Sequence, residues 1–319
     1  MTQLFRDVVG KRLCPSGSVV CIGAFDGLHR GHQALIGRAR DRACALSLPV
    51  VALSFEPLPR EFFSPNHPPA RLLTARAKFE GLRAMEVDVV GLLRFNAAMV
   101  AMSAEEFIES VLIKRLSARE VWVGPEFRFG KDRSGDVATL RHYGGERGFA
   151  VREIAPVEID GERVSSSNLR KHLAAGELAA AAQGLGWRYA IVGKVVRGPQ
   201  LGRTLGYPTA NIRLGRRRPA LAGIFATWVH GVGDAPWPSV SSLGTRPTVQ
   251  GVEPLLEAHL FDFAGDLYGR RIEVEFVAKL RDELKFDDLP ALVAQMDIDA
   301  QQARKLLRHD TKQLELARE

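Results

Sequence analysis

The feature that most constrains the fold is an alternation of two hydrophobic patterns in the first half of the chain. Short runs rich in β-branched residues, typical of buried strands, alternate with segments whose apolar residues recur at helical spacing. The strand-like runs cover 19–22, 50–55, 88–93, 120–124 and 151–154, and the helical patterns cover 31–46, 75–85 and 104–116. This alternation predicts an α/β fold in which helices cover both faces of a parallel sheet. Ser103 followed by Glu106 resembles a capping box and predicts that a helix begins there.

The pattern changes after an alanine-rich helical stretch that ends near Gly186. Strand-like runs then follow one another over 189–196, 223–231, 240–243, 255–261 and 271–280, and a last helical pattern covers about 289–307. This succession predicts an antiparallel β-barrel with a terminal helix packed on it. A chain of 319 residues with 46% hydrophobic residues is sufficient for two cores. We therefore predict an α/β domain over residues 1–186 and a β domain over residues 187–319.

The turn between the first of these strands and its helix combines glycines with histidines. Gly23, Gly27 and Gly31 allow backbone N–H groups to approach a ligand, and the helix start adds unpaired donors and a partial positive charge. His29 and His32 can donate hydrogen bonds to the same point without a permanent charge. That property suits oxygens whose negative charge grows during a displacement. Residues 23–32, called the histidine turn below, are therefore predicted to bind phosphate.

Three other interpretations of the histidine turn compete with phosphate binding. A metal site is disfavoured because no further Cys or His lies nearby at the spacing of zinc ligands. A dinucleotide-binding turn is excluded because its order of glycines is different and histidines are unusual in it. Helix capping or surface exposure would explain either histidine alone, whereas two histidines, three glycines and Asp26 in one turn favour a ligand site.

Two further segments of the first half carry side chains suited to ligands. Phe127 and Arg128 lie in a loop after the strand over 120–124, where an aromatic face can stack a planar ring and a cation can hold phosphate. A solvated loop with buried Phe side chains is the alternative. Ser165 and Ser166 begin a hydroxyl cluster at the head of a helix, and Arg170 follows one turn later. Capping would explain the serines by themselves, but together with the histidine turn they predict a second phosphate-binding segment.

The net charge of +7 is unevenly distributed along the chain. Residues 178–233 contain no Asp or Glu but several Arg and Lys, so this stretch attracts anions. Because no recognised nucleic-acid motif accompanies the charge, we predict no nucleic-acid partner. The sequence contains neither a run of about twenty apolar residues nor the pattern of a signal peptide, which predicts a cytoplasmic protein without a membrane partner.

The motifs of both halves together resemble one family. Gly-Ala-Phe-Asp-Gly-Leu-His-Arg-Gly-His over 23–32, Phe-Arg-Phe-Gly over 127–130 and Ser-Ser-Ser-Asn-Leu-Arg over 165–170 resemble the nucleotidyltransferase domain of bacterial bifunctional riboflavin kinase/FAD synthetases. In the second half, Gly-Lys-Val-Val-Arg-Gly over 193–198 and the segment 202–211, which contains Pro-Thr-Ala-Asn, resemble the riboflavin kinase signature. The resemblance implies a Rossmann-like nucleotidyltransferase domain followed by a β-barrel riboflavin kinase domain.

The resemblance implies two ATP-dependent reactions, of which the second domain would carry out the first. It would transfer the γ-phosphoryl group of ATP to the ribityl 5'-hydroxyl of riboflavin, giving FMN. The residues implied for this reaction are Glu257 as general base, Thr209 and Asn211 as ligands of Mg²⁺, and Lys194 and Arg203 as partners of the ATP phosphates.

The first domain would then join FMN to ATP, giving FAD and pyrophosphate by direct displacement without a protein nucleophile. His29, His32 and Arg170 would stabilise the developing charge. The residues implied to bind the substrates are Gly23, Phe25, Asp26, Gly31, Phe127, Arg128, Ser165 and Ser166. Pro199 and Ser242 depart from the usual family pattern, so an enzyme that retains only one activity is the alternative. A basic nucleic-acid-binding protein with decayed sites is a further one.

Overall fold

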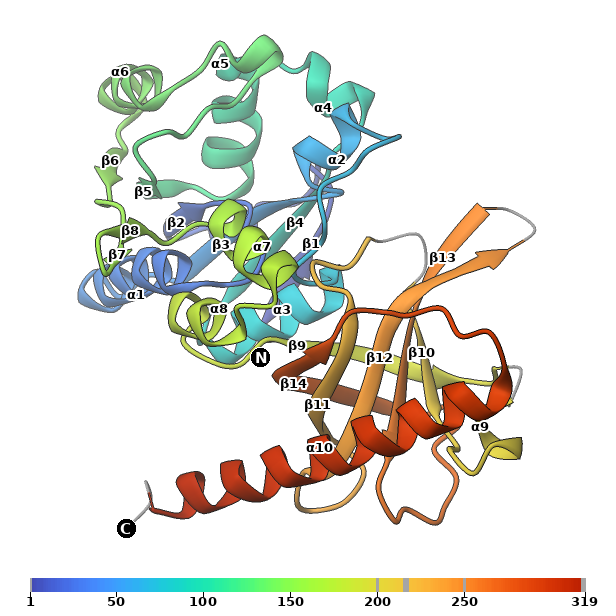
Figure 1. Cartoon of the computed structure of the whole chain (residues 1–319). Coiled ribbons are helices and arrows are strands. Elements are labelled where there is room, and N and C mark those ends of the chain that lie inside the picture. The colour runs from blue at the N-terminus through green and yellow to red at the C-terminus, as the bar shows by residue number, and fades with distance from the viewer. Residues whose placement is uncertain (1, 199–200, 215–217, 249–250, 317–319) are drawn as a thin grey trace. The chain divides into compact units, whose positions relative to one another are not determined.

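A computed structural model describes residues 2–198, 201–214, 218–248 and 251–316 of the chain (Figure 1). Its contacts divide the chain into a first unit of Met1–Pro69 and Leu73–Ser166 and a second unit of Ala70–Leu72 and Ser167–Glu319. Residues 167–186 are thus grouped with the second unit, whereas the sequence analysis assigns them to the first domain. The domain boundary after Gly186 stays a prediction.

The first unit is built on a parallel sheet of six strands. In spatial order these are β1 (Gln3–Phe5), β4 (Val89–Arg94), β3 (Val50–Glu56), β2 (Ser18–Ile22), β5 (Ala118–Val123) and β6 (Ala150–Glu153). Every neighbouring pair is parallel, so the predicted α/β class is confirmed. All residues of the central strand β2 are buried. The prediction missed β1, because a strand of three residues is too short to show a period.

Helices cover both faces of this sheet. Val19 and Cys21 of β2 share a buried cluster with residues of α1 (Arg30–Ala45) and α3 (Ala75–Ala84). Their neighbours Val20 and Ile22 share another cluster with residues of α5 (Ala104–Phe107), the π-helix η1 (Ile108–Arg115) and α6 (Val137–Arg147). This alternation is what a central strand with side chains on both faces requires. The smaller elements are α2 (Pro59–Phe63), α4 (Ala97–Ala101), η2 (Lys131–Arg133), β7 (Glu158–Ile159) and β8 (Glu162–Arg163).

The predicted capping box is present at the start of α5. The Glu106 N–H donates to Ser103 Oγ at 3.0 Å, and the Ser103 N–H donates to Glu106 Oε2 at 2.8 Å. The helix predicted over 104–116 differs from the structure in one respect, since the four residues of α5 continue as a π-helix. Hydrophobic periodicity indicates that a helix exists, but it does not distinguish an α-helical from a π-helical turn over so short a segment.

The second unit is built on a closed barrel, which confirms the predicted β class. Around the barrel the strands are β10 (Ala210–Arg213), β13 (Gly251–Leu260), β12 (Trp237–Thr248), β11 (Gly223–His230), β14 (Arg271–Arg281) and β9 (Ala190–Val196). All neighbours are antiparallel, and pairing of β9 with β10 closes the ring. The prediction missed β10, because the buried Asn211 interrupts its apolar pattern.

Helices pack on the barrel at two places. Leu169 and Leu173 of α7 (Ser166–Ala175) share the core cluster of the barrel with α8 (Leu178–Leu185), which explains why these helices group with the second unit. The terminal helix α10 (Leu289–Leu316) runs along the outside of the barrel (Figure 1). It confirms the predicted terminal helix and is longer than predicted. A short helix, α9 (Leu201–Thr204), precedes β10.

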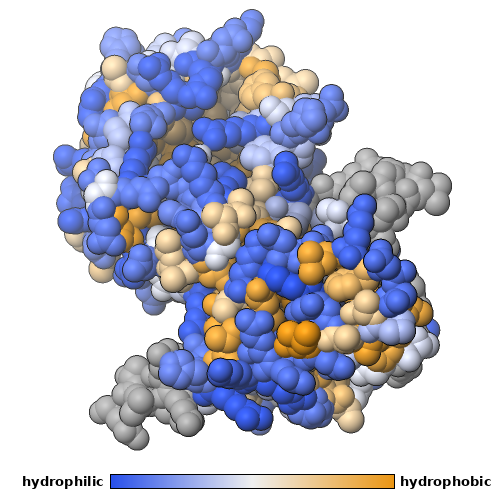
Figure 2. Space-filling model, viewed as in Figure 1, coloured by the Kyte–Doolittle hydropathy of each residue, from blue (hydrophilic) through white to orange (hydrophobic). Residues whose placement is uncertain are grey.

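Hydrophilic residues predominate on the viewed face, and hydrophobic residues are scattered among them (Figure 2). The exposed large hydrophobic residues include Val9, Phe63, Trp187 and Leu284, which lie on separate segments. Within the described ranges, no helix is both long and apolar enough to cross a membrane.

Candidate active sites

The histidine turn begins at the carboxyl end of β2 and leads into α1. Its backbone is tightly folded, because Phe25 and Leu28 have left-handed φ angles of 48° and 47° and Gly27 has a φ of 93°. The side chains of Phe25 and Leu28 are buried. Residues other than glycine adopt this conformation at a cost in free energy and keep it where the surrounding structure holds them, commonly at functional sites.

The two imidazole rings of the histidine turn stack on each other. The ring centroids of His29 and His32 are 3.7 Å apart, and Phe25 meets the His32 ring edge-on at 5.2 Å. Gly31 makes room for the stack, because a Cβ there would lie 3.2 Å from the His29 ring. His29 occupies the N-cap of α1 without a side-chain capping bond, which argues against helix capping as its role.

His32 is held in its neutral form. Burial lowers the pKa of its imidazole well below the ordinary value, and the charges of His29 and Lys78 lower it further. The buried Nδ1 of His32 has no hydrogen-bond partner within the part of the chain that the structure describes. A neutral ring with an unused polar atom is suited to a hydrogen bond with a substrate oxygen.

The serine segment contacts the histidine turn, and its phosphate-binding role stays a prediction. Ser166 Oγ donates to the carbonyl oxygen of Asp26 at 2.7 Å, and a Cβ on Gly31 would lie 3.6 Å from the carbonyl oxygen of Val164. Oδ1 of the buried Asp26 accepts from the Leu73 N–H at 2.9 Å, so this carboxylate structures the turn. Ser165 directly precedes Ser166, the residue that contacts Asp26.

Arg170 lies one turn into α7, within the second unit. Its Nε donates to the carbonyl oxygen of Ala70 at 2.6 Å. The side chain is therefore held by the backbone of its own unit, and its predicted role in charge stabilisation stays a prediction.

The aromatic loop after β5 is partly a core element. Phe127 stacks on Phe129 with ring centroids 5.4 Å apart, and Phe129 is buried against Phe107. Arg128 is half-exposed and its Nη1 donates to Asp136 Oδ2 at 3.3 Å. Phe127 stays a candidate for stacking a planar ring, whereas Phe129 serves packing.

Sequence reasoning missed two polar residues directly behind the histidine turn. Lys78 of α3 and Ser54 of β3 are fully buried, and both donate to the carbonyl oxygen of Ala24, at 2.8 Å and 3.0 Å. A signal was available for Lys78, because it stands four residues before the buried Leu82 on the apolar face of α3. A lysine at a core position of an amphipathic helix indicates a buried partner.

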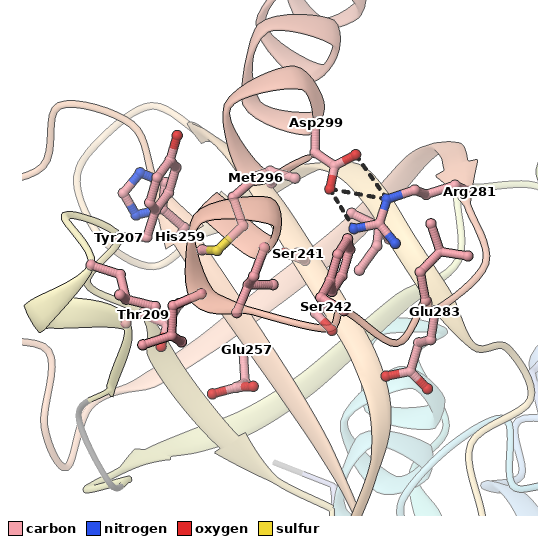
Figure 3. A pocket seen from close by; sticks show the side chains of 18 of the residues that line it. Tyr207, Thr209, Ser241, Ser242, Glu257, His259, Arg281, Glu283, Met296 and Asp299 are labelled. Carbon is pink, nitrogen blue, oxygen red and sulfur yellow. Dashed lines mark hydrogen bonds and ion pairs between the residues drawn. The ribbon is translucent and has the colours of Figure 1, made fainter. Parts of the chain in front are cut away.

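The second unit contains a pocket of about 650 Å³ (Figure 3). Thr209 and Glu257 lie on one side of it, and Glu283 with Arg281 and Asp299 lies on the other. Met296 of α10 lies between the two sides. A volume of this size suits a drug-sized ligand or cofactor.

Asn211 and Glu257 are directly opposite each other on neighbouring strands β10 and β13. Asn211 is buried, and its Nδ2 donates to the carbonyl oxygen and to Oγ1 of Thr209, at 3.2 Å each. Its Oδ1 is buried without a hydrogen-bond partner among the described residues, and a Cβ on Gly198 would lie 2.7 Å from it. An amide oxygen and a hydroxyl oxygen therefore lie near a carboxylate, and the roles that the resemblance implies for these three residues stay predictions.

The other side of the pocket is held by an ion pair between β14 and α10. Arg281 donates from Nε to Asp299 Oδ1 at 2.9 Å and from Nη2 to Asp299 Oδ2 at 2.7 Å. Burial raises the pKa of the Glu283 carboxyl and the charge of Glu257 raises it further, while Arg281 opposes both effects. Sequence reasoning assigned no role to these residues, because it predicts that the terminal helix packs on the barrel but not which of its side chains meets Arg281.

Of the two cations predicted to bind ATP phosphates, Lys194 is not among the described residues that line this pocket. Lys194 is exposed on β9, opposite Arg271 of β14. Arg203 belongs to α9, and its side chain lies outside the described residues, as does Pro199. Their roles stay predictions.

His259 connects β13 with the segment that precedes β10. It stands two residues after Glu257 on β13, and its Nδ1 is 2.9 Å from the carbonyl oxygen of Pro208. Its ring also meets that of Tyr207, with centroids 4.9 Å apart. The sequence could have indicated that His259 lies near Glu257, because alternate residues of a strand such as β13 lie on the same face.

A turn with two stacked histidines at the carboxyl end of a parallel strand, and a barrel pocket in which a carboxylate lies near an amide oxygen and a hydroxyl oxygen, fit a transferase with two sites. The family model of FAD synthetase matches residues 11–168, and that of riboflavin kinase matches residues 185–307. The chain belongs to the family of bifunctional riboflavin kinases/FMN adenylyltransferases. It phosphorylates riboflavin to FMN and adenylylates FMN to FAD, as the resemblance implies.

Individual relatives agree with this assignment. The bifunctional riboflavin kinase/FMN adenylyltransferase of Pseudomonas fluorescens is 45% identical over 95% of this chain and 97% of its own length. That of Escherichia coli K12 is 43% identical, again over 95% of this chain and 97% of its own length. A solved structure described as a macrolide-efflux protein from Streptococcus pneumoniae matches with a TM-score of 0.78 and 31% identity, over 93% of this chain and 97% of that one.

Proposed function

We propose that riboflavin is phosphorylated in the barrel pocket and that FMN is adenylylated at the histidine turn, with ATP as the co-substrate of both reactions. The observation that carries the first assignment is the cross-strand pair of Asn211 and Glu257. In this pair a carboxylate faces an amide side chain within a pocket of about 650 Å³, a size that suits a cofactor-sized ligand, and this supports Glu257 as the base. The second assignment rests on the neutral His32 at the start of α1.

In the barrel pocket, Glu257 takes the proton of the ribityl 5'-hydroxyl as the oxygen attacks the γ-phosphorus of ATP. The new P–O bond gives FMN, and ADP leaves with the electron pair of the broken P–O bond. Positioning and charge neutralisation dominate such transfers, and a placed general base contributes a rate factor of about 10² to 10⁴.

Thr209 and Asn211 fit the requirements of Mg²⁺. A hydroxyl and an amide carbonyl are hard oxygen ligands, and Oδ1 of Asn211 is buried without another partner in the described part of the chain. Such an orphaned oxygen costs free energy unless a ligand satisfies it. When bound, the ion neutralises phosphate charge. Thr209 and Asn211 are the side chains that would hold it, in the pocket that Glu257 also lines.

At the histidine turn, the FMN phosphate attacks the α-phosphorus of ATP and pyrophosphate leaves. The reaction needs no protein nucleophile, so the turn acts by stabilising charge. His29 and His32, the N–H groups around Gly31 and the Ser165 hydroxyl supply donors there, while Ser166, which donates to the Asp26 carbonyl oxygen, holds the turn beside the substrate. Gly23, Phe25 and Asp26 shape the turn that holds the phosphates, and Phe127 and Arg128 extend the substrate site.

The matched experiment for the barrel pocket is Glu257→Gln, assayed by chromatographic separation of flavins. We expect riboflavin phosphorylation to fall by about 10²-fold or more, because the base is lost. Adenylylation of supplied FMN should continue, and Glu273→Gln, on β14 outside the pocket, should leave both reactions unchanged. A Glu257→Gln variant that still phosphorylates riboflavin at the original rate contradicts the assignment.

The partners that this proposal requires are riboflavin, FMN, ATP and Mg²⁺. No nucleic acid and no membrane takes part in either reaction. A cytoplasmic location, where ATP is supplied, belongs to the same proposal.

A further inference from the structure

A fully buried lysine lies behind the histidine turn. The Nζ of Lys78 donates to the carbonyl oxygen of Ala24 at 2.8 Å and to Ser54 Oγ at 3.2 Å. The carboxylate of Glu56 is 3.9 Å away through Oε2. Burying an ammonium group is costly unless hydrogen bonds and an opposite charge compensate it. All three compensating groups belong to β3 or to the histidine turn.

The carbonyl group of Ala24, which Lys78 contacts, helps to fix the backbone of the histidine turn. Ala24 lies between Gly23, at the end of β2, and Phe25, whose φ is 48°. Ser54 Oγ donates to the same carbonyl at 3.0 Å, so two buried donors fix one peptide group. That peptide orients Phe25, which in turn contacts the His32 ring edge-on. A chain of direct contacts therefore connects Lys78 to the histidine pair.

Lys78 also brings a charge to this region. Its ammonium is close enough to His32 to help keep that imidazole neutral. A fixed cation behind the turn acts in the same direction as the partial positive charge at the start of α1. The carboxylate of Glu56, 3.9 Å from Nζ, offsets part of the lysine charge. The rest of the lysine field and the helix start both favour an anion in front of the turn, because a buried charge is screened weakly.

We propose that Lys78 is a positioning residue for adenylyl transfer, which fixes the Ala24 peptide and, through Phe25, the two histidines, and which adds a buried positive charge behind the phosphates. This proposal rests on the proposed assignment of the histidine turn to FMN adenylylation. A lysine that only stabilises the fold would have the same contacts, so the two roles must be separated by experiment.

The test compares Lys78→Met, which removes donor and charge, with Lys78→Gln, which retains a donor. Both full-length variants are assayed with supplied FMN and ATP, well below their measured unfolding midpoints. We expect kcat for adenylylation to fall by about 10- to 100-fold in Lys78→Met, because a misplaced site loses this much. The KM values for FMN and ATP should change by less than about threefold, and Lys78→Gln should recover part of the kcat.

Two measurements on the same samples serve as controls. Riboflavin phosphorylation by the barrel should be unchanged, and Lys114→Met, at an exposed lysine of the first unit, should leave adenylylation unchanged. A Lys78→Met variant that is less stable yet adenylylates FMN at the original kcat when folded overturns the proposal, because the role is then structural. If Lys78→Met does not fold, the kcat of Lys78→Gln decides in the same way.

His32→Ala, assayed in parallel, separates the two levels of inference. If His32→Ala retains full adenylylation, the assignment of the histidine turn is wrong, and the proposal for Lys78 falls with it. If His32→Ala loses adenylylation but Lys78→Met and Lys78→Gln do not, only the proposal for Lys78 is overturned.

Discussion

His32 illustrates how a single residue can supply hydrogen bonds without supplying charge. Its ring stacks on His29, meets Phe25 edge-on and keeps a depressed pKa through burial. A permanent cation would bind substrate and transition state with similar strength, whereas a neutral donor gains most where oxygen charge grows. The histidine turn therefore combines a neutral His32 with the fixed field of a helix start.

We expect His32→Ala to reduce FAD formation from supplied FMN by about 10²-fold or more, because one donor to the developing charge is lost. FMN formation from riboflavin should continue, since that reaction is assigned to the barrel. Chromatography of the flavins formed from each substrate checks both statements. Equal loss of the two activities would indicate general destabilisation instead.

The depressed pKa of His32 also predicts how the stability of the first unit depends on pH. Because the folded-state pKa lies below the ordinary value of 6.5, protons bind the unfolded chain preferentially below that pH. The unit should be fully stabilised above about pH 6.5 and lose stability as the pH falls further. We expect hydrogen exchange of the β2 amides to speed up less between about pH 7 and pH 5 in His32→Asn than in the original chain, after correction for the intrinsic exchange rates.

At the scale of secondary structure, the terminal helix α10 is part of the barrel pocket rather than an appendage. Asp299 of α10 is buried and bonded through two oxygens to Arg281 at the end of β14, and Gln295 donates to Asp299 Oδ1 at 3.0 Å. Met296 of the same helix lines the pocket. Loss of the ion pair therefore affects the fold and the pocket together.

We expect Asp299→Asn to destabilise the second unit by about 3 kcal/mol, because it leaves a mostly buried guanidinium without its counter-charge. The measurement is urea unfolding followed by fluorescence, since Trp187, Trp228 and Trp237 all belong to that unit. The pair between Asp262 and Arg304 offers a control, because Asp262 is 76% exposed and Asp262→Asn should therefore cost much less stability than Asp299→Asn. Equal costs for the two variants would contradict this ranking.

The success of sequence reasoning differed between elements for physical reasons. Long strands with a clear period, such as β3 and β14, were predicted to within a few residues. The short strands β1 and β10 were not predicted. β1 has only three residues, and the buried Asn211 interrupts the apolar run of β10.

At the scale of the whole molecule, the sites divide into residues that are neighbours in sequence and residues that only the fold unites. The histidine turn was predictable, because its donors lie within one strand-to-helix turn. Lys78 could not be connected with Ala24, which is 54 residues away, and Arg281 could not be connected with Asp299 on another element. Such contacts depend on strand order and helix packing, which local patterns do not specify.

The two reactions should also be separable between molecules. Neither His32→Ala nor Glu257→Gln alone should make FAD from riboflavin at the original rate. A mixture of the two variants should make it, because FMN released by the kinase of one chain is a substrate for the adenylyltransferase of the other. Chromatography after incubation with riboflavin, ATP and Mg²⁺ measures this, and a mixture that accumulates FMN without FAD would contradict it.

The pairing of β9 with β14 has a consequence for biosynthesis. The first unit can complete its sheet as soon as β6 has left the ribosome, because all its strands precede residue 154. The barrel cannot close until β14 has been synthesised, because β14, its last strand, pairs with β9, its first strand. Until then β9 and β10 lack this closure. During translation, the nascent chain therefore carries a finished sheet followed by an open row of strands, and kinase competence is acquired only in the final stage of synthesis.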